Sequence, residues 1–356
     1  MAEETPTLPD LSCEALDVVV RQLSPQEVGR LVRASRALAA VEKVLTSSWA
    51  LLRADVETGG WKAACRAAAE RGDVQAVRWV AAQGHELESA CSSAARGGHI
   101  EMLRFLHART AEWAWNSWVV LAASECGHLE ALQWLRLQDP PCAWDHRACE
   151  AAAKGGHVTV LRWLRAQGCP WYYDGVCFRA ADNGDLDTLQ WLRAQAPLGP
   201  WGETLCTRAA AGGHVDVLRW LRLELTPPCA WGTAVCEAAA KAGRLDVLRF
   251  ARSQSPPCPW SATTCAKAAF NGHLEVLRFA RSESPPCPWD AGACTGAAMR
   301  GQLEALKWLR GQVPPCPWDP DSCMEWARGQ PDILLWVEEE RASCARGGPP
   351  WQCILM

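Results

Sequence analysis

The sequence predicts an all-α protein in which about ten helix-pair repeats stack as a solenoid. A glycine followed by a polar and an aliphatic residue recurs at intervals of 26 to 30 residues, and an aromatic residue follows each glycine by seven positions. A fixed period of this length indicates a repeat array rather than separate globular domains, the other arrangement open to 356 residues. The repeating glycines are Gly72, Gly98, Gly127, Gly156, Gly184, Gly213, Gly243, Gly272, Gly301 and, in degenerate form, Gly329.

Each repeat contains the signals for two short helices. In one repeat, Asp145 precedes an alanine-rich run that stops at Gly155 and Gly156. Asp is a good helix N-cap and Gly a natural helix end, so this run is the expected first helix. Leu161 and Leu164 then mark the apolar face of a second helix, which a proline-bearing loop ends. One pair cannot bury this face alone, so neighbouring pairs must stack.

Composition excludes several classes of function. The formal net charge is -4, with 36 Lys and Arg against 40 Asp and Glu, so we expect no nucleic-acid partner. No signal peptide is recognisable, and no window approaches the roughly 18 uncharged apolar residues of a membrane span. We therefore expect a cytoplasmic protein whose 19 cysteines are mostly reduced.

Cysteine forms two ladders along the repeats. We interpret both as packing positions, because free Cys behaves as a small hydrophobe. Zinc would need ligand pairs two to four residues apart, whereas Cys258 and Cys265 are seven apart, so no metal is expected. Cross-linking of neighbouring loop thiols under oxidation stays open. The loop ladder is Cys142, Cys229, Cys258, Cys287 and Cys316, and the helix ladder is Cys149, Cys177, Cys206, Cys236, Cys265, Cys294 and Cys323.

Histidine and arginine also recur in register. Five histidines share the slot after the glycine, where other repeats carry Asp, Arg or Gln, so a structural hydrogen bond is the expected role. No residue stands out as a nucleophile or base and no phosphate loop is present, so we expect neither catalysis nor a cofactor. The second helices carry an arginine ladder, interpreted as a solvated face, with a site for acidic ligands as the alternative: Arg162, Arg165, Arg219, Arg222, Arg249, Arg252, Arg278 and Arg281.

The run from Cys265 to Phe279 resembles the helix pair of an ankyrin repeat in a shortened form with a CPWD loop. The resemblance covers roughly residues 61–340. It departs from the family in the usual Thr-Pro-Leu-His opening, which is Cys-centred here, and in its short, proline-bearing loop. The resemblance implies a non-catalytic protein that binds other proteins. We expect the partner surface at first-helix and loop positions that vary between repeats, namely Lys154, Arg179, Asp182, Arg208, Lys241, Lys267, Phe270 and Arg300.

Residues 8–52 lie outside the repeat and follow an expected disordered start, residues 1–7. Their pattern of Leu-Pro, an aliphatic helix, Ser-Pro and a second helix resembles an F-box. That resemblance implies docking onto a Skp-type adaptor of a cullin-RING ubiquitin ligase, with the repeats choosing the substrate. A helical cap for the solenoid, in a scaffold with no link to ubiquitin, is the alternative. The implied adaptor contacts are Leu8, Pro9, Leu16, Leu23 and Leu31.

Residues 341–356 form an expected flexible tail ending in Cys353, Ile354, Leu355 and Met356. This ending fits the C-a-a-X prenylation signal, and the final Met favours a farnesyl group. The sequence therefore predicts a tether to the cytosolic face of membranes, with a coincidental tail as the alternative. One prenyl chain gives only marginal attachment, so acylation of Cys344 would be needed for a stable anchor.

Overall fold

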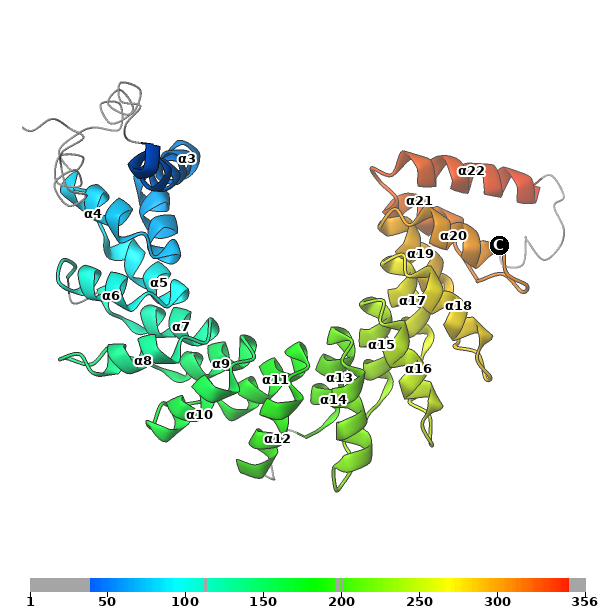
Figure 1. Ribbon diagram of the computed structural model, residues 1–356. Helices are drawn as coiled ribbons and strands as arrows, with labels where there is room; N and C mark the ends of the chain where they lie inside the picture. The colour runs from blue at the N-terminus through cyan, green and yellow to red at the C-terminus, as the bar shows by residue number, and fades with distance from the viewer. Residues whose placement is uncertain (1–38, 112–113, 196–198, 200, 346–356) are drawn as a thin grey trace, which may run out of the picture. The chain divides into compact units, whose positions relative to one another are not determined.

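The computed structural model describes residues 39–111, 114–195, 199 and 201–345 of the chain (Figure 1). These described ranges contain helices and no strand, which confirms the prediction of an all-α helical-repeat solenoid. The chain divides into two compact units, Met1–Tyr172 and Tyr173–Met356. Each unit is a stack of helix pairs.

In the first unit the long helix α3 (Ala39–Arg71) bends at Gly60, whose φ of 72° is non-helical. The part of α3 after Gly60 forms the first pair with α4. First helices pack on first helices, from α3 to α5, α7 and α9, and this contact is more extensive than that between second helices. The remaining helices are α4 (Val74–Ala82), α5 (Glu88–Gly97), α6 (Ile100–His107), α7 (Ser117–Glu125), α8 (Leu129–Arg136), α9 (His146–Lys154) and α10 (Val158–Ala166).

The second unit repeats the same arrangement, with α11, α13, α15, α17, α19 and α21 as its first helices. One second helix, α14, continues into a short π-helical stretch, η4 (Trp220–Glu224). The helices are α11 (Tyr173–Asn183), α12 (Leu186–Gln195), α13 (Glu203–Gly212), α14 (Val215–Arg219), α15 (Thr233–Lys241), α16 (Leu245–Ser253), α17 (Ala262–Phe270), α18 (Leu274–Ser282), α19 (Ala291–Met299), α20 (Leu303–Arg310), α21 (Pro320–Trp326) and α22 (Pro331–Ala345).

Caps and glycines set the helix boundaries as the sequence predicts. The Asp145 carboxylate accepts a hydrogen bond of 2.9 Å from the Arg147 N–H, which satisfies a backbone donor at the start of α9. Ser261 and Thr264 form a capping box at the start of α17. At the end of α5, Gly98 has a φ of 71°, a left-handed conformation that favours glycine.

The first helices contribute small apolar residues to the core, and the second helices contribute large ones. Ala268, Ala269, Ala297 and Ala298 are fully buried on α17 and α19, where the short side chain lets the first helices approach closely. The second helices contribute larger buried residues, such as Leu277 on α18. This division accounts for the extensive contact between first helices.

Candidate functional site

Each repeat has a loop side, formed by its second helix and the loop that follows. Many second helices carry two arginines, and we call the one nearer the C-terminal end, such as Arg252, the inner arginine. On this side of the repeat the inner arginine has a structural role. Arg252 Nη1 donates to the Cys258 carbonyl at 2.7 Å, and its guanidinium lies 4.0 Å from the centre of the Trp260 ring. The same Arg–Cys–Trp arrangement recurs at Arg136, Cys142 and Trp144, at Arg165, Cys169 and Trp171, at Arg222, Cys229 and Trp231, at Arg281, Cys287 and Trp289, and at Arg310, Cys316 and Trp318.

This geometry divides the arginine ladder into two groups. The inner arginines of the ladder hold the loop in place, and they are Arg165, Arg222, Arg252 and Arg281. Neither interpretation of the ladder, a solvated face or a site for acidic ligands, describes this role. The other group is exposed, and two of its members form weak i, i+3 ion pairs, Arg219 with Asp216 and Arg278 with Glu275. These outer arginines are Arg162, Arg219, Arg249 and Arg278.

The loop tryptophan joins two helix pairs. Trp231 lies 4.4 Å from the Arg222 guanidinium of the preceding pair and meets Phe250 of the following pair edge to face, with ring centroids 6.3 Å apart. Trp201 meets Trp220 in the same way at 5.9 Å. Such contacts contribute stability beyond that of the area the rings bury, so the loop tryptophan and the aromatic residue of the second helix both hold neighbouring helix pairs together.

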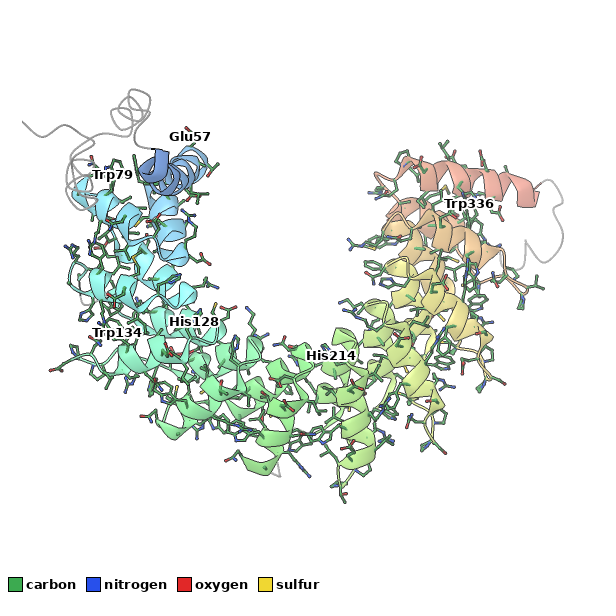
Figure 2. All side chains as sticks on the ribbon, in the orientation of Figure 1. Glu57, Trp79, His128, Trp134, His214 and Trp336 are labelled. Atoms are coloured by element: carbon green, nitrogen blue, oxygen red, sulfur yellow. The ribbon has the colours of Figure 1, made fainter. Side chains whose placement is uncertain are left out.

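The histidine slot also joins neighbouring repeats. Two residues of this slot, His128 and His214, are labelled in Figure 2. His128 Nε2 lies 2.8 Å from the Arg96 carbonyl, and His214 Nε2 lies 2.8 Å from the Asp182 carbonyl. Both carbonyls lie at the end of the preceding first helix, where backbone acceptors lack helical partners. The expected structural hydrogen bond is therefore present, but it reaches the previous repeat. Arg244 substitutes for histidine by donating from Nε to the Ala211 carbonyl at 3.3 Å.

We call the eight predicted partner positions the first-helix surface: Lys154, Arg179, Asp182, Arg208, Lys241, Lys267, Phe270 and Arg300. Lys154 belongs to the first unit and the other seven to the second. All lie at or near the C-terminal ends of first helices, and each is half-buried or exposed.

Several charges of the first-helix surface pair between adjacent repeats. Arg208 Nη1 lies 2.8 Å from Asp182 Oδ2, and Arg179 approaches the same oxygen at 3.9 Å. Lys267 Nζ lies 2.7 Å from Glu237 Oε2. Burial raises the pKa of Glu237, but hydrogen bonds from Lys267 and Ser261 outweigh it and leave the pKa lowered. Part of the surface charge is thus compensated internally.

In the first unit the acidic partner is Glu125. Lys154 Nζ lies 2.7 Å from Glu125 Oε1, and Arg96 approaches the other oxygen at 3.8 Å. The hydrogen bond from Lys154 lowers the pKa of Glu125 against the opposing effect of burial. Sequence reasoning missed Glu125 and Glu237. The signal was present for Glu125, because it occupies the slot of Lys154 one repeat earlier with the opposite charge.

The remaining surface residues are aromatic or exposed. The Arg300 guanidinium lies 5.0 Å from the Phe270 ring centre, and a Cβ added at Gly296 of α19 would lie 3.7 Å from a carbon of this ring. Arg208 lies 4.7 Å from the Phe178 ring in the same manner. The side chain of Lys241 is exposed. The second unit therefore presents basic and aromatic groups together on successive first helices.

Other predicted sites fall elsewhere. The adaptor-contact residues Leu8, Pro9, Leu16, Leu23 and Leu31, and the lipidation residue Cys353, lie outside the described residues. Within the described ranges, no group of three or more His, Cys, Asp or Glu side chains is placed to hold a metal ion. Among the same residues, no helix is long and apolar enough to cross a membrane.

Comparison with known proteins supports the repeat class. Residues 177–222 match the family of ankyrin repeats in many copies, which confirms the resemblance for that stretch. No curated protein matches the chain. The described residues thus form a helical-repeat scaffold that includes an ankyrin-repeat match, and scaffolds of this kind typically act by binding rather than by catalysis.

Two solved structures of the pentatricopeptide repeat protein PPR10, each in complex with an 18-nt psaJ RNA element, are similar to this chain. The first is 17% identical with a TM-score of 0.40, and the alignment covers 93% of this chain and 53% of that chain. The second, a cysteine-substituted form, is 14% identical with a TM-score of 0.36 and coverages of 94% and 57%. This chain therefore spans little more than half the length of either.

Proposed function

We propose that the protein is a non-catalytic receptor that binds a partner protein through the first-helix surface. One observation carries this proposal: the residues that are constant between repeats are occupied in packing, while the exposed ends of the first helices differ in charge and size. Lys241, Phe270 and Met299 stand in one slot of three successive repeats. Variation at exposed positions of a rigid stack is the usual source of specificity in repeat proteins.

Alanine substitution of the whole first-helix surface tests this proposal. Affinity purification of the full chain from its own cells, with quantitative mass spectrometry, should lose its specific partners in this variant. A matched control replaces the exposed outer arginines Arg162, Arg219, Arg249 and Arg278 with alanine, and should keep them. Circular dichroism must show unchanged helix content in both proteins. Retention of partners by the first variant and their loss from the second would contradict the proposal.

The finer proposal is that the receptor serves a ubiquitin ligase. Residues 8–52 would dock as an F-box onto a Skp-type adaptor with its cullin, and the repeats would select the substrate. Support comes from the F-box-like pattern and from α3, which continues from residue 39 into the first helix pair. Leu8→Ala with Pro9→Ala should abolish co-purification of the adaptor and leave the repeats folded. Absence of adaptor from the wild-type purification would return the segment to the alternative, a cap in a scaffold with no link to ubiquitin.

The tail carries a separate proposal, a prenyl group on Cys353 that tethers the protein to membranes. Intact-mass analysis of protein from eukaryotic cells should show loss of the last three residues and gain of the lipid. Cys353→Ser should move the membrane-bound fraction to the cytosol. An unmodified C-terminus would contradict the tether.

We expect the partner to be a protein rather than a nucleic acid, because the chain carries no basic excess. The PPR10 structures contain RNA, but with TM-scores of 0.40 and 0.36 they carry no argument about what this chain binds. Gel-shift titration with single-stranded RNA at physiological salt should show no retarded complex. A tight, salt-sensitive complex that the outer-arginine variant weakens would contradict this expectation.

A further inference from the structure

The two cysteine ladders meet in space. Cys206 on α13 and Cys229 in the loop after η4 face each other with their Sγ atoms 2.8 Å apart. Both side chains lie inside the repeat, with exposures of 0% and 1%. The two residues are 23 positions apart in the chain, so the contact closes the loop onto the first helix of its own repeat.

The arrangement recurs through both units. In each of these repeats a cysteine on the first helix and a cysteine in the loop after the second helix are buried, and the loop thiol donates to the carbonyl of the residue that precedes the first helix. The five pairs are Cys149 with Cys169, Cys206 with Cys229, Cys236 with Cys258, Cys265 with Cys287, and Cys294 with Cys316.

Three contacts hold each loop cysteine in position. In the Cys206–Cys229 pair, the Cys229 carbonyl accepts a hydrogen bond from Arg222 Nη1 at 2.7 Å. The Cys229 backbone N–H donates to the Leu221 carbonyl at 2.9 Å. Its thiol donates to the Gly202 carbonyl, at the N-cap of α13, at 3.1 Å. The sulfur is therefore fixed against its partner by the fold before any bond forms between them.

Packing alone does not require sulfur in both positions. The first-helix slot opposite Cys142 holds Val120, and the loop position that contacts Cys91 is Thr110, whose Oγ1 lies 3.7 Å from Sγ. Both alternatives are accommodated in otherwise similar repeats. Paired cysteine in five repeats therefore calls for a chemical role as well as a steric one.

The electrostatics make the two thiols of a pair unequal. A hydrogen bond from Cys206, with help from the Arg222 guanidinium, outweighs burial and lowers the pKa of Cys229. The pKa of Cys206 is raised by the same hydrogen bond and by burial. The same asymmetry holds for Cys258 with Cys236. The loop cysteine is thus the nucleophile in these two pairs, since the thiolate is the reactive form.

We propose that these five pairs are sites of oxidation by hydroperoxides, and that each forms a disulfide within its own repeat. The loop thiol attacks the peroxide, its sulfur becomes a sulfenic acid, and the peroxide leaves as an alcohol or, from hydrogen peroxide, as water. The helix thiol then attacks the sulfenic sulfur, the S–S bond forms, and the hydroxyl leaves with the thiol proton as water. Two thiols lose two electrons and two protons, and one peroxide is reduced.

Burial determines when the reaction occurs. Because both sulfurs lie away from solvent, the oxidant reaches them when the loop opens locally. Oxidation should consequently be slow compared with that of an exposed thiol and faster in mild urea. Once formed, the disulfide fastens the loop to the first helix, so it should slow later opening of the same repeat.

The experiment uses the full chain, produced in bacteria and treated with hydrogen peroxide while folded. After blocking of free thiols in denaturant, peptide mapping without reductant should find the five native pairs linked. Titratable thiols should fall from 19 to about nine, because ten cysteines belong to pairs. Dithiothreitol should restore all of them. Free thiols in the five pairs, or cross-links joining other cysteines, would overturn the proposal.

A variant provides the internal control. Cys206→Val copies the valine of the Val120 slot, and should leave Cys229 reduced while the other four pairs still form. Cys142, opposite Val120, should remain a free thiol in both proteins. If Cys206→Val does not fold, the wild-type map alone still decides. Linkage of Cys142 or Cys229 to another cysteine in a folded sample would contradict the assignment.

Discussion

On the loop side of successive repeats, Arg252 with Trp260 and Arg281 with Trp289 are placed almost identically, with guanidinium-to-ring distances of 4.0 and 3.9 Å. On the first-helix side the matching slot changes from Lys241 to a phenylalanine and then a methionine. The two sides belong to the same repeats and meet different demands. Residues that couple neighbours are constrained by the next repeat, whereas exposed helix ends are free to differ and so to confer specificity.

The largest expected effect concerns the aromatic residue that recurs in every repeat. If this residue were not needed for stability, the contrast between the two sides of the repeat would be wrong. Trp220→Ala should lower the free energy of unfolding by about 3–5 kcal/mol, the usual cost of truncating a buried large aromatic. Trp220 is 7% exposed and packs on Trp201. The exposed Trp118 is the control, and its alanine variant should cost about 1 kcal/mol or less. Urea unfolding followed by circular dichroism measures both, and equal losses would contradict the account.

The glycine and histidine slots offer the next effect. A Cβ at Gly243 would lie 2.8 Å from the His273 ring, and the φ of 68° disfavours any side chain. Gly243→Ala should therefore cost about 2–4 kcal/mol, from left-handed strain plus overpacking. Gly156→Ala meets nothing within 4 Å at a φ of 73° and should cost about 1–2 kcal/mol. Adding His273→Ala should recover part of the Gly243 loss. If the double variant were no more stable to thermal unfolding than Gly243→Ala alone, the contact between the added Cβ and the His273 ring would not be responsible for the loss.

Two arginines of α16 sharpen the contrast within one helix. Arg252→Met keeps the aliphatic stem but loses the bond to the Cys258 carbonyl, and should cost about 1.5–3 kcal/mol. Arg249→Met changes an exposed side chain of the same helix and should stay within about 0.5 kcal/mol of wild type. Denaturant midpoints compare the two variants. A larger loss at Arg249 would reverse the assignment of inner and outer arginines.

The smallest expected effect concerns the first-helix surface. Because Lys154 holds the pKa of Glu125 below its ordinary value, the pair stabilises the fold at neutral pH, and this contribution is lost as the pH falls through the lowered value. Lys154 is mostly exposed, so Lys154→Met should cost only about 0.2–1 kcal/mol at pH 7, and less in acid. Lys241→Met is the control and should show no such pH dependence. A pH-independent loss at Lys154 would show that packing, not charge, is responsible.

Periodicity predicted the helix pairs and their caps, because these depend on contacts within one turn or one repeat. The inner arginines were not recognised, since Arg252 acts on a loop carbonyl that only the folded turn brings within reach. The cysteine partners were missed for the same reason. Cys258 is seven residues from Cys265 in sequence, yet it pairs with Cys236, which is 22 residues earlier.

A site-specific photo-crosslinking residue tests the central claim most directly, because it needs no prior identification of the partner. Placed at Lys241, on the first-helix surface, it should form discrete protein adducts in cells on illumination. Placed at Arg249, on the exposed face of the following second helix, it should form none above background. Protein adducts at Arg249 with none at Lys241, or adducts to RNA at either position, would contradict the account.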